Sequence, residues 1–222
     1  MIVMKLENIG LTFNEKAFFS KEKVETLKID ALKNINIDIE KNSIIGLTGP
    51  NGSGKSTLLK VMGGILSPTK GSLISNFEPN LMVHSNFNII DDANGHENAE
   101  LFLNLKRINP KEIPEKIELI KKVSGLENFF YQKVKIYSTG MRFRLSFACL
   151  EQINSEILLM DEWVSTADKK MRDYVKSSIT SKMQHAKATV IASHNIEILN
   201  SICNKIYELQ NGEIVDEKKI YE

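Results

Sequence analysis

The chain has 222 residues, of which 42% are hydrophobic and 26% charged, a length and composition typical of a soluble globular protein with one large domain. Its 29 Lys and Arg residues nearly balance its 28 Asp and Glu residues, which argues against a nucleic-acid-binding surface and against an acidic tail. No apolar run approaches the ~18 residues of a membrane span, and Lys5 and Glu7 interrupt the region where a signal peptide would be apolar. We therefore expect a soluble intracellular protein.

The first forty residues predict two strands. Residues 1–13 and residues 31–40 each alternate apolar with polar side chains, as half-buried strands do. The stretch 14–30 between them is rich in charged residues. We expect a loop or a hairpin there.

From residue 44 onward, short apolar strands alternate with helical patterns. Strands are predicted at residues 44–48, 157–160 and 189–192, and a hairpin at 205–217 that turns at Asn211-Gly212. Helical spacing of apolar residues is found at 56–66, 98–107, 110–123, 141–151, 171–185 and 195–203. This alternation predicts an α/β fold with a mostly parallel core sheet and an antiparallel β edge from the early strands. The block 98–132 is helical without a strand, and we expect it to form a small subdomain.

The two cysteines, Cys149 and Cys203, lie in apolar or mixed stretches and form no CxxC motif. Such cysteines are typical of the reduced core of an intracellular protein. We expect neither a disulfide nor a metal site from them.

The strongest chemical signal is the octamer Gly49-Pro50-Asn51-Gly52-Ser53-Gly54-Lys55-Ser56, followed by Thr57. It matches the phosphate-loop pattern GxxxxGK[ST], with an apolar strand before it and a helix after it. The glycines let backbone N–H groups turn toward a β-phosphate, and the helix N-terminus adds a favourable dipole. Lys55 is expected to bridge the β- and γ-phosphates, and the Ser56 hydroxyl to bind Mg²⁺. The sequence therefore predicts a nucleotide-binding site.

A second signal is the apolar strand 157–160, which ends in Asp161-Glu162. Ligands of open α/β sheets bind at the carboxyl ends of the strands, so we expect Asp161 to hold Mg²⁺ through water and Glu162 to polarise the attacking water. A solvated acidic turn is the alternative. His194, which closes another strand, either caps that strand or contacts the γ-phosphate.

The stretch Tyr137-Ser138-Thr139-Gly140-Met141-Arg142-Phe143-Arg144-Leu145-Ser146-Phe147-Ala148 resembles the signature motif of ABC-type ATPases. A phosphate loop alone is shared by many NTPases, but the order of loop, signature, Asp161-Glu162 strand and His194 is specific to this family. The resemblance runs from Leu6 to Gly212. It implies that residues 1–222 form a single ABC ATPase cassette with ATP as its nucleotide, in which the helical subdomain includes the start of the signature helix.

The resemblance also implies a dimer of two head-to-tail copies. Each ATP would lie between the phosphate loop of one copy and the signature of the other, so no monomer carries a complete site. Ser138 and the backbone amide of Gly140 would donate to the γ-phosphate of the partner's ATP. Asp168 falls where the family's D-loop makes a contact across the dimer.

Two further positions follow from the resemblance alone. Phe13 falls where the family places the aromatic ring that stacks on adenine, but Phe18 and Phe19 are rivals for that role, and a core role for Phe13 is equally open. Most ABC ATPases also place a glutamine at the junction of their lobes. No glutamine occurs between Lys55 and Gln132, and His84 falls near that place.

The signature carries Met141 where most importers have glutamine, and in this it resembles the cassettes of exporters of O-antigen, capsule or teichoic acid. The segment Asn94-Gly95-His96-Glu97-Asn98 resembles the Thr-Gly-Arg-Glu-Asn segment of the same exporters. The resemblance implies an ATP-hydrolysing motor subunit, peripheral to the cytoplasmic face of the inner membrane, whose partner is a separate transmembrane permease. By analogy with the family, the block 98–132 is the candidate surface for that partner.

Other functions remain open. An exporter of a lipid or a drug keeps the family and changes only the substrate. A soluble ABC-type ATPase of DNA repair or translation is disfavoured because the stretch from Lys55 to Ser138 is too short for a long coiled coil, the chain carries one cassette, and its charge is near neutral. A small-molecule kinase would leave the signature without a purpose. We therefore expect no nucleic acid among the partners.

Overall fold

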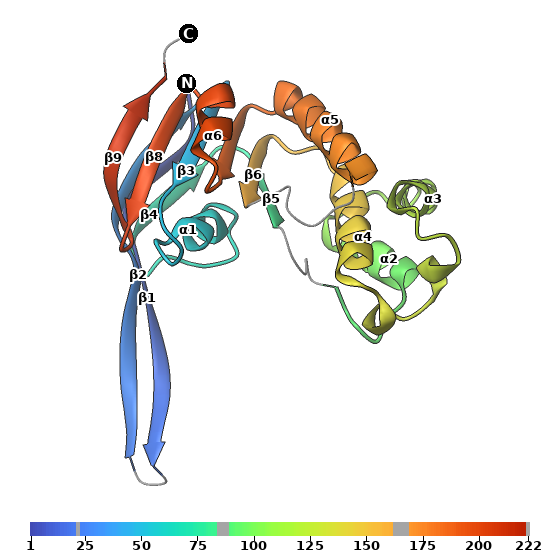
Figure 1. The fold of residues 1–222 in the computed structure, drawn as a ribbon, viewed down its shortest axis with the longest axis horizontal. Coiled ribbons are helices and arrows are strands. Elements are labelled where there is room, and N and C mark those ends of the chain that lie inside the picture. The colour runs from blue at the N-terminus through green and yellow to red at the C-terminus, as the bar shows by residue number, and fades with distance from the viewer. Residues whose placement is uncertain (21–22, 84–88, 162–168, 221–222) are drawn as a thin grey trace. The chain divides into compact units, whose positions relative to one another are not determined.

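The computed structural model describes residues 1–20, 23–83, 89–161 and 169–220, and of these it does not describe the side chains of 15–20, 23–26, 82–83 and 169–172. The chain divides into two compact units, whose strands and helices are drawn in Figure 1. The first unit holds Met1–Leu81, Ser155–Glu162 and His185–Glu222, and the second holds Met82–Asn154 and Trp163–Gln184.

Three strands of the first unit form an antiparallel sheet in the order β2-β1-β4. They are β1 (Ile2–Ser20), β2 (Lys23–Glu40) and β4 (Lys70–Ser75). The predicted alternation in β2 places Ile35, Ile37 and Ile39 in the core and leaves the polar residues between them exposed. Because β1 and β2 pair as far as Ser20 and Lys23, the stretch 14–30 is a hairpin, one of the two alternatives that the sequence left open.

The sequence pattern does not predict β4, because its residues are exposed except for the half-buried Leu73, and no apolar alternation marks it. β4 pairs with β1, and the expectation that the early strands form an edge of the parallel sheet is wrong. The early strands form a sheet of their own and do not edge the parallel sheet.

The second sheet of the first unit has the strand order β5-β6-β7-β3-β8-β9. Its strands are β3 (Ser43–Thr48), β5 (Pro79–Val83), β6 (Ile157–Asp161), β7 (Ala188–Ala192), β8 (Lys205–Gln210) and β9 (Glu213–Lys219). The strands β6, β7, β3 and β8 are parallel, and β9 closes the edge as the antiparallel partner of β8. The predicted parallel core is therefore confirmed, and so is the hairpin at Asn211-Gly212; β5 is not predicted.

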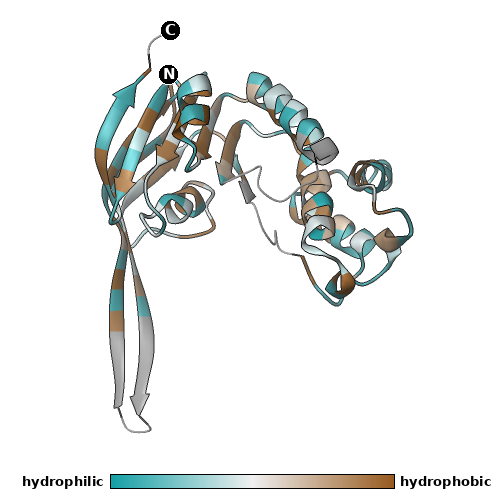
Figure 2. Ribbon diagram, viewed as in Figure 1, coloured by the Kyte–Doolittle hydropathy of each residue, from teal (hydrophilic) through white to brown (hydrophobic). Residues whose placement is uncertain are grey.

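The central strands are buried on both faces, which explains why they read as continuous apolar runs. Every residue of β7 is buried, and so are the first four of β6. The helix α1 (Lys55–Met62) packs against β6 and β7, and α6 (Ile196–Ile202) packs against β3. Figure 2 shows the hydrophobic residues gathered in these strands.

Both cysteines are free and buried, as predicted. Burial raises the pKa of the Cys149 thiol to about 12 and that of the Cys203 thiol to about 12. Thiols that stay protonated at neutral pH are poor nucleophiles and poor metal ligands. Both residues therefore serve packing.

The second unit is helical. It contains α2 (Gly95–Leu105), α3 (Ile113–Ser124), α4 (Thr139–Glu151) and α5 (Lys169–His185), with the short 3₁₀ helices η1 (Glu127–Tyr131) and η2 (Val134–Ile136) between α3 and α4. The predicted helices are present, with ends shifted by a few residues. Phe130 of η1 is fully buried. Among the described residues, no helix combines the length and hydrophobicity that crossing a bilayer requires.

Candidate nucleotide site

The phosphate loop lies between the end of β3 at Thr48 and the start of α1 at Lys55. Gly54 is the N-cap of α1, and none of the side chains that the structure describes caps this helix end. The first backbone N–H groups of an α-helix have no partner within the helix, and the helix dipole gives this end a partial positive charge. An uncapped N-terminus at this position is suited to an anion.

Two glycines let the loop lie against the backbone of neighbouring strands. Gly49 has a φ of 134°, and a Cβ atom there would lie 2.0 Å from the carbonyl oxygen of Leu209. Gly54 has a φ of 107°, and its Cβ would lie 2.9 Å from the carbonyl oxygen of Ala31. Any other residue would clash with backbone at both positions. The loop is therefore held between the end of β8 and the middle of β2.

Gly212, in the turn between β8 and β9, supports the loop from outside. Its N–H donates to the carbonyl oxygen of Ser53 at 3.0 Å, and its own carbonyl oxygen accepts from the N–H of Lys33 at 2.8 Å. A Cβ at Gly212, whose φ is 81°, would lie 2.7 Å from the Ala31 carbonyl oxygen. The sequence identifies Gly212 only as a turn residue, because a hydrogen bond to a loop so distant in the chain leaves no local pattern.

The side chains of the loop fit a phosphate group. Lys55 is 6% exposed, and its Nζ donates to the carbonyl oxygens of Gly49 at 2.9 Å and Pro50 at 3.0 Å. Ser53 is 2% exposed, and its Oγ has no hydrogen-bond partner among the described residues. A buried hydroxyl without a partner costs about 1–3 kcal/mol. A phosphate oxygen in the loop would offer that hydroxyl an acceptor.

The remaining loop residues are accessible. The exposed ones are Pro50, Asn51, Gly52 and Ser56, and the half-buried ones are Gly49, Gly54 and Thr57. Among the described residues, no heavy atom lies within 4 Å of an added Cβ at Gly52.

The sheet register places two further predicted residues at the same edge. Asp161 of β6 is level with Ala192 of β7, and Ala192 is level with Leu47 of β3. The phosphate loop begins two residues after Leu47, and His194 lies two residues after Ala192. Asp161 is half-buried and His194 is exposed. The predicted Glu162 and Asp168, and His84, lie outside the described residues.

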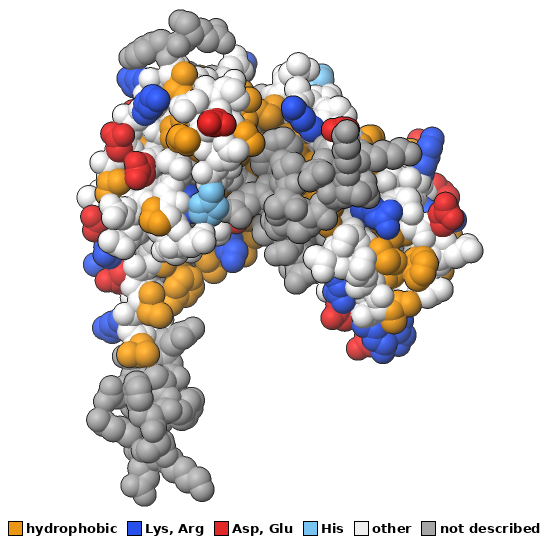
Figure 3. All heavy atoms as spheres, viewed as in Figure 1, with side chains coloured by type: hydrophobic (Ala, Val, Ile, Leu, Met, Phe, Trp, Pro, Cys, Tyr) orange, Lys and Arg blue, Asp and Glu red, His pale blue; other side chains and the backbone are white. Residues whose placement is uncertain are grey.

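Phe13 lies on the hairpin, where it pairs with Ile29. It is 38% exposed, so the alternative of a core role is wrong. The exposed hydrophobic side chains of Leu27 and Ile29 accompany it on β2, and Figure 3 shows hydrophobic side chains on the described part of the hairpin. The side chains of Phe18 and Phe19 are not described. The stacking role of Phe13 stays a prediction.

The signature residues belong to the second unit. Ser138 is the N-cap of α4, and its Oγ accepts from the N–H of Met141 at 3.3 Å. Gly140 lies in the first turn of α4, and the Ser138 Oγ would lie 4.0 Å from an added Cβ there. The chain thus carries a phosphate loop in one unit and a signature turn in the other.

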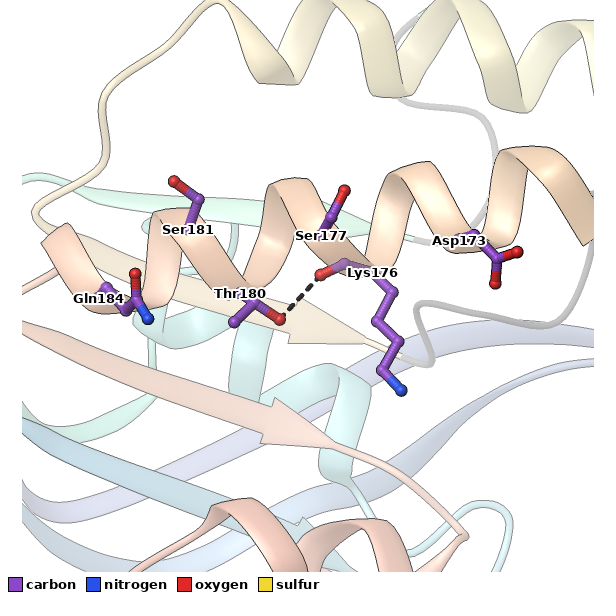
Figure 4. Close-up of a pocket in the computed structure, with 6 residues that line it drawn as sticks. All are labelled: Asp173, Lys176, Ser177, Thr180, Ser181 and Gln184. Atoms are coloured by element: carbon purple, nitrogen blue, oxygen red, sulfur yellow. Dashed lines mark hydrogen bonds between the residues drawn. The ribbon is translucent and has the colours of Figure 1, made fainter.

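A shallow hollow of about 430 Å³ lies along α5, lined by Asp173, Lys176, Ser177, Thr180, Ser181 and Gln184. Figure 4 shows that all six side chains come from this one helix, and that Ser177 and Ser181 point to one side of it while Lys176 and Thr180 point to the other. The Thr180 hydroxyl donates to the carbonyl oxygen of Lys176 at 2.9 Å. None of these residues belongs to the predicted site.

The support from Gly212 is testable through Gly212→Ala. The added methyl group would push the turn away from Ala31, and the Ser53 carbonyl would follow. We expect the ATP affinity to fall roughly tenfold, which corresponds to about 1.4 kcal/mol, as measured by titration with a fluorescent ATP analogue.

Gly64→Ala is the matched control, because Gly64 also has a positive φ of 69° but no heavy atom within 4 Å of an added Cβ. It carries a similar backbone strain and should keep the wild-type affinity. Wild-type ATP affinity in Gly212→Ala would contradict the supporting role.

The ABC transporter family model matches residues 32–165. Two similar proteins are the teichoic acids export ATP-binding protein TagH of Shouchella clausii, 34% identical over 89% of this chain and 54% of its own length, and the O-antigen export system ATP-binding protein RfbE of Yersinia enterocolitica, 31% identical over 87% and 81%. The chain thus spans about half the length of that TagH.

Among solved structures, the ATP-binding cassette MJ0796, a dimer in a post-hydrolysis state bound to ADP and Pi, is 25% identical with a TM-score of 0.78 over 99% of both chains. The family match covers more than half of the 222 residues, and the similarity in fold extends over nearly all of them. This chain belongs to the ABC transporter family.

Proposed function

We propose that this protein is the ATP-hydrolysing motor subunit of an ABC exporter, and that the exporter moves a lipid-linked polysaccharide such as O-antigen, capsule or teichoic acid across the cytoplasmic membrane. The observation that carries the proposal is the likeness to RfbE, which covers 87% of this chain and 81% of that protein. The likeness to TagH proteins supports the same chemical class of cargo.

The first unit would bind ATP and Mg²⁺. The Ser53 hydroxyl, the uncapped end of α1 and the buried Lys55 are the groups that would hold the phosphates. Mg²⁺ is usually held by one or two protein oxygens together with phosphates and water, and we assign Ser56 and Asp161 to it. The ion would supply positive charge against the phosphate oxygens.

Hydrolysis would need a base and a contact to the γ-phosphate. Glu162 directly follows Asp161, the last residue of β6, in the sequence, and we assign it to orient and polarise the attacking water. His194 follows β7 at the same edge as Asp161, and we assign it to the γ-phosphate.

A second copy would complete each site. Ser138 and Gly140 lie at the N-terminal end of α4, where backbone N–H groups have no partner within the helix, and this suits donation from both residues to the ATP of the other copy. The dimeric structure of MJ0796 supports a dimer, and the head-to-tail arrangement is part of our proposal. Binding of ATP between the copies would bring them together, and hydrolysis would let them separate.

A separate transmembrane permease is the other proposed partner, with this chain peripheral on the cytoplasmic face of the inner membrane. The block 98–132 offers it exposed apolar side chains, because Leu101 and Leu105 of α2 are 38% and 65% exposed and Leu119 of α3 is 41% exposed. Exposed apolar side chains are frequent at protein interfaces. His84 stays the candidate for the missing glutamine.

Deletion of the gene in its native host tests the cargo. We expect lipid-linked polysaccharide to accumulate inside the cell while it disappears from the surface, because export needs the motor. Both pools are measured by fractionation and surface labelling, with the gene restored from a plasmid as the control. An unchanged surface polymer would contradict the polysaccharide assignment and point to a lipid or a drug as cargo.

The chemistry is tested by Glu162→Gln, which keeps the size of the side chain and removes its charge. We expect ATP binding to persist, turnover to fall by about 10²–10⁴-fold, and a dimer to accumulate in ATP. Titration with a fluorescent ATP analogue measures the binding, phosphate release measures the turnover, and light scattering measures the dimer. Hydrolysis at the wild-type rate would exclude Glu162 as the catalytic carboxylate.

Lys55→Ala is the contrasting control for that experiment. It removes the cation of the phosphate loop itself, so ATP binding should weaken and no dimer should accumulate. Unchanged ATP affinity in this variant would count against the phosphate-loop assignment.

A further inference from the structure

The segment before α2 and the segment before α4 are joined along their backbones. The N–H of Lys135 donates to the carbonyl oxygen of Asp91 at 2.9 Å, and the N–H of Val134 donates to that of Ala93 at 2.9 Å. Asn94 and Lys133 form an isolated antiparallel bridge. We call residues 91–95 and 133–137, with these contacts, the clasp. In Figure 1 the two segments run side by side at the end of the second unit.

Side chains add to the clasp. Arg142, in the first turn of α4, donates from Nη1 to Asp91 Oδ1 at 2.5 Å, and the side chain of Arg142 is 21% exposed. Lys135 Nζ lies 3.1 Å from Asp92 Oδ1, and hydrogen bonding to Lys135 and its positive charge hold the pKa of Asp92 below its usual value. Figure 3 shows Lys and Arg side chains beside acidic ones at this end of the unit.

Tyr137, the residue just before Ser138, is also held by close contacts. A Cβ at Gly95 would lie 2.8 Å from the Tyr137 hydroxyl oxygen and 2.8 Å from the carbonyl oxygen of Phe130, so Gly95 packs closely against the Tyr137 side chain and the backbone of η1. The Tyr137 hydroxyl donates to the carbonyl oxygen of Phe129 at 2.5 Å. Burial raises the pKa of Tyr137, which keeps this donor protonated.

Arg142 is also bonded to the signature turn itself. Its N–H donates to the carbonyl oxygen of Ser138 at 3.0 Å. The Asp91 carboxylate therefore binds, through the side chain of Arg142, the first turn of α4, which carries Ser138 and Gly140. A shift of Asp91 would tilt that turn, while the phosphate loop, which belongs to the first unit, would keep its own support from β8 and β2.

We propose that Asp91 and Arg142 are positioning residues, which orient Ser138 and Gly140 toward the ATP of the second copy. This inference rests on the proposed ATP-sandwich dimer. Because the signature acts on the other copy, the ion pair governs turnover in the dimer and leaves the binding of ATP to the phosphate loop of its own chain untouched. An ion pair with an exposed carboxylate contributes little to overall stability, so the two effects are separable.

The test is Asp91→Asn in the full chain. We expect turnover to fall between about tenfold and a hundredfold, the scale of a small misplacement of a reacting group, with the affinity of the monomer for a fluorescent ATP analogue unchanged. Glu156→Gln is the matched control, because Glu156 makes an ion pair with Lys187 that is also 2.5 Å long and part-exposed, in the first unit. It should keep wild-type turnover.

The reversed pair Asp91→Arg with Arg142→Asp should recover turnover, since the attraction is restored with the charges exchanged. Any of four results would overturn the positioning role. Two concern Asp91→Asn: wild-type turnover, or a loss of ATP affinity that parallels the loss of turnover. The others are an equal loss of turnover in Glu156→Gln and no recovery of turnover in the reversed pair. If the wild-type protein forms no dimer in ATP, the proposed function is wrong. If the wild-type protein forms the dimer and Asp91→Asn has the same turnover as wild type, only the positioning role is wrong.

Discussion

The phosphate loop is packed closely between two backbone carbonyl groups, one from β8 and one from β2, and the rest of the site depends on this close packing. The carbonyl oxygens of Leu209 and Ala31 lie so close to Gly49 and Gly54 that a Cβ atom added at either glycine would clash with them. The loop therefore passes close to β8 and β2 at once, and Gly212 bonds it to both neighbours. A loop held in this way keeps its backbone N–H groups oriented before any anion arrives, which avoids the cost of ordering them on binding.

The sheet brings further site residues to the same edge as the phosphate loop. Parallel strands end at one edge, so a residue at the end of β6 and a residue just after β7 lie at the same edge as the loop after β3. The second unit builds the signature turn in a different way, from an N-cap serine and a clasp between two distant segments. We propose that each chain holds two halves of different sites. In our account they become whole only when two copies meet.

Local sequence predicts the parts whose cause is local. The octamer 49–56 predicts a phosphate loop because its glycines and lysine act over a few residues, and the buried runs of β6 and β7 predict central strands because every residue there is apolar or small. The place of Asp161 at the sheet edge follows from the same runs. The helix predicted at 141–151 is α4, which begins two residues earlier, at Thr139, because Ser138 caps it.

The missed features depend on pairing between distant residues. β4 carries no apolar alternation, and only its register with β1, which brings Lys5 opposite Ile74, makes it a strand. That pairing also gives the early strands a sheet of their own. The exposure of Phe13, the support from Gly212 and the ion pair between Asp91 and Arg142 likewise follow from tertiary contacts. No spacing in the chain signals them.

If one chain carries only half of each ATP site, turnover must depend on protein concentration. We would measure the rate of phosphate release per molecule over a dilution series, with light scattering to report the fraction of dimer. We expect the rate per molecule to rise with the dimer fraction and then to level off. A constant rate per molecule in solutions where the protein is monomeric throughout would contradict it.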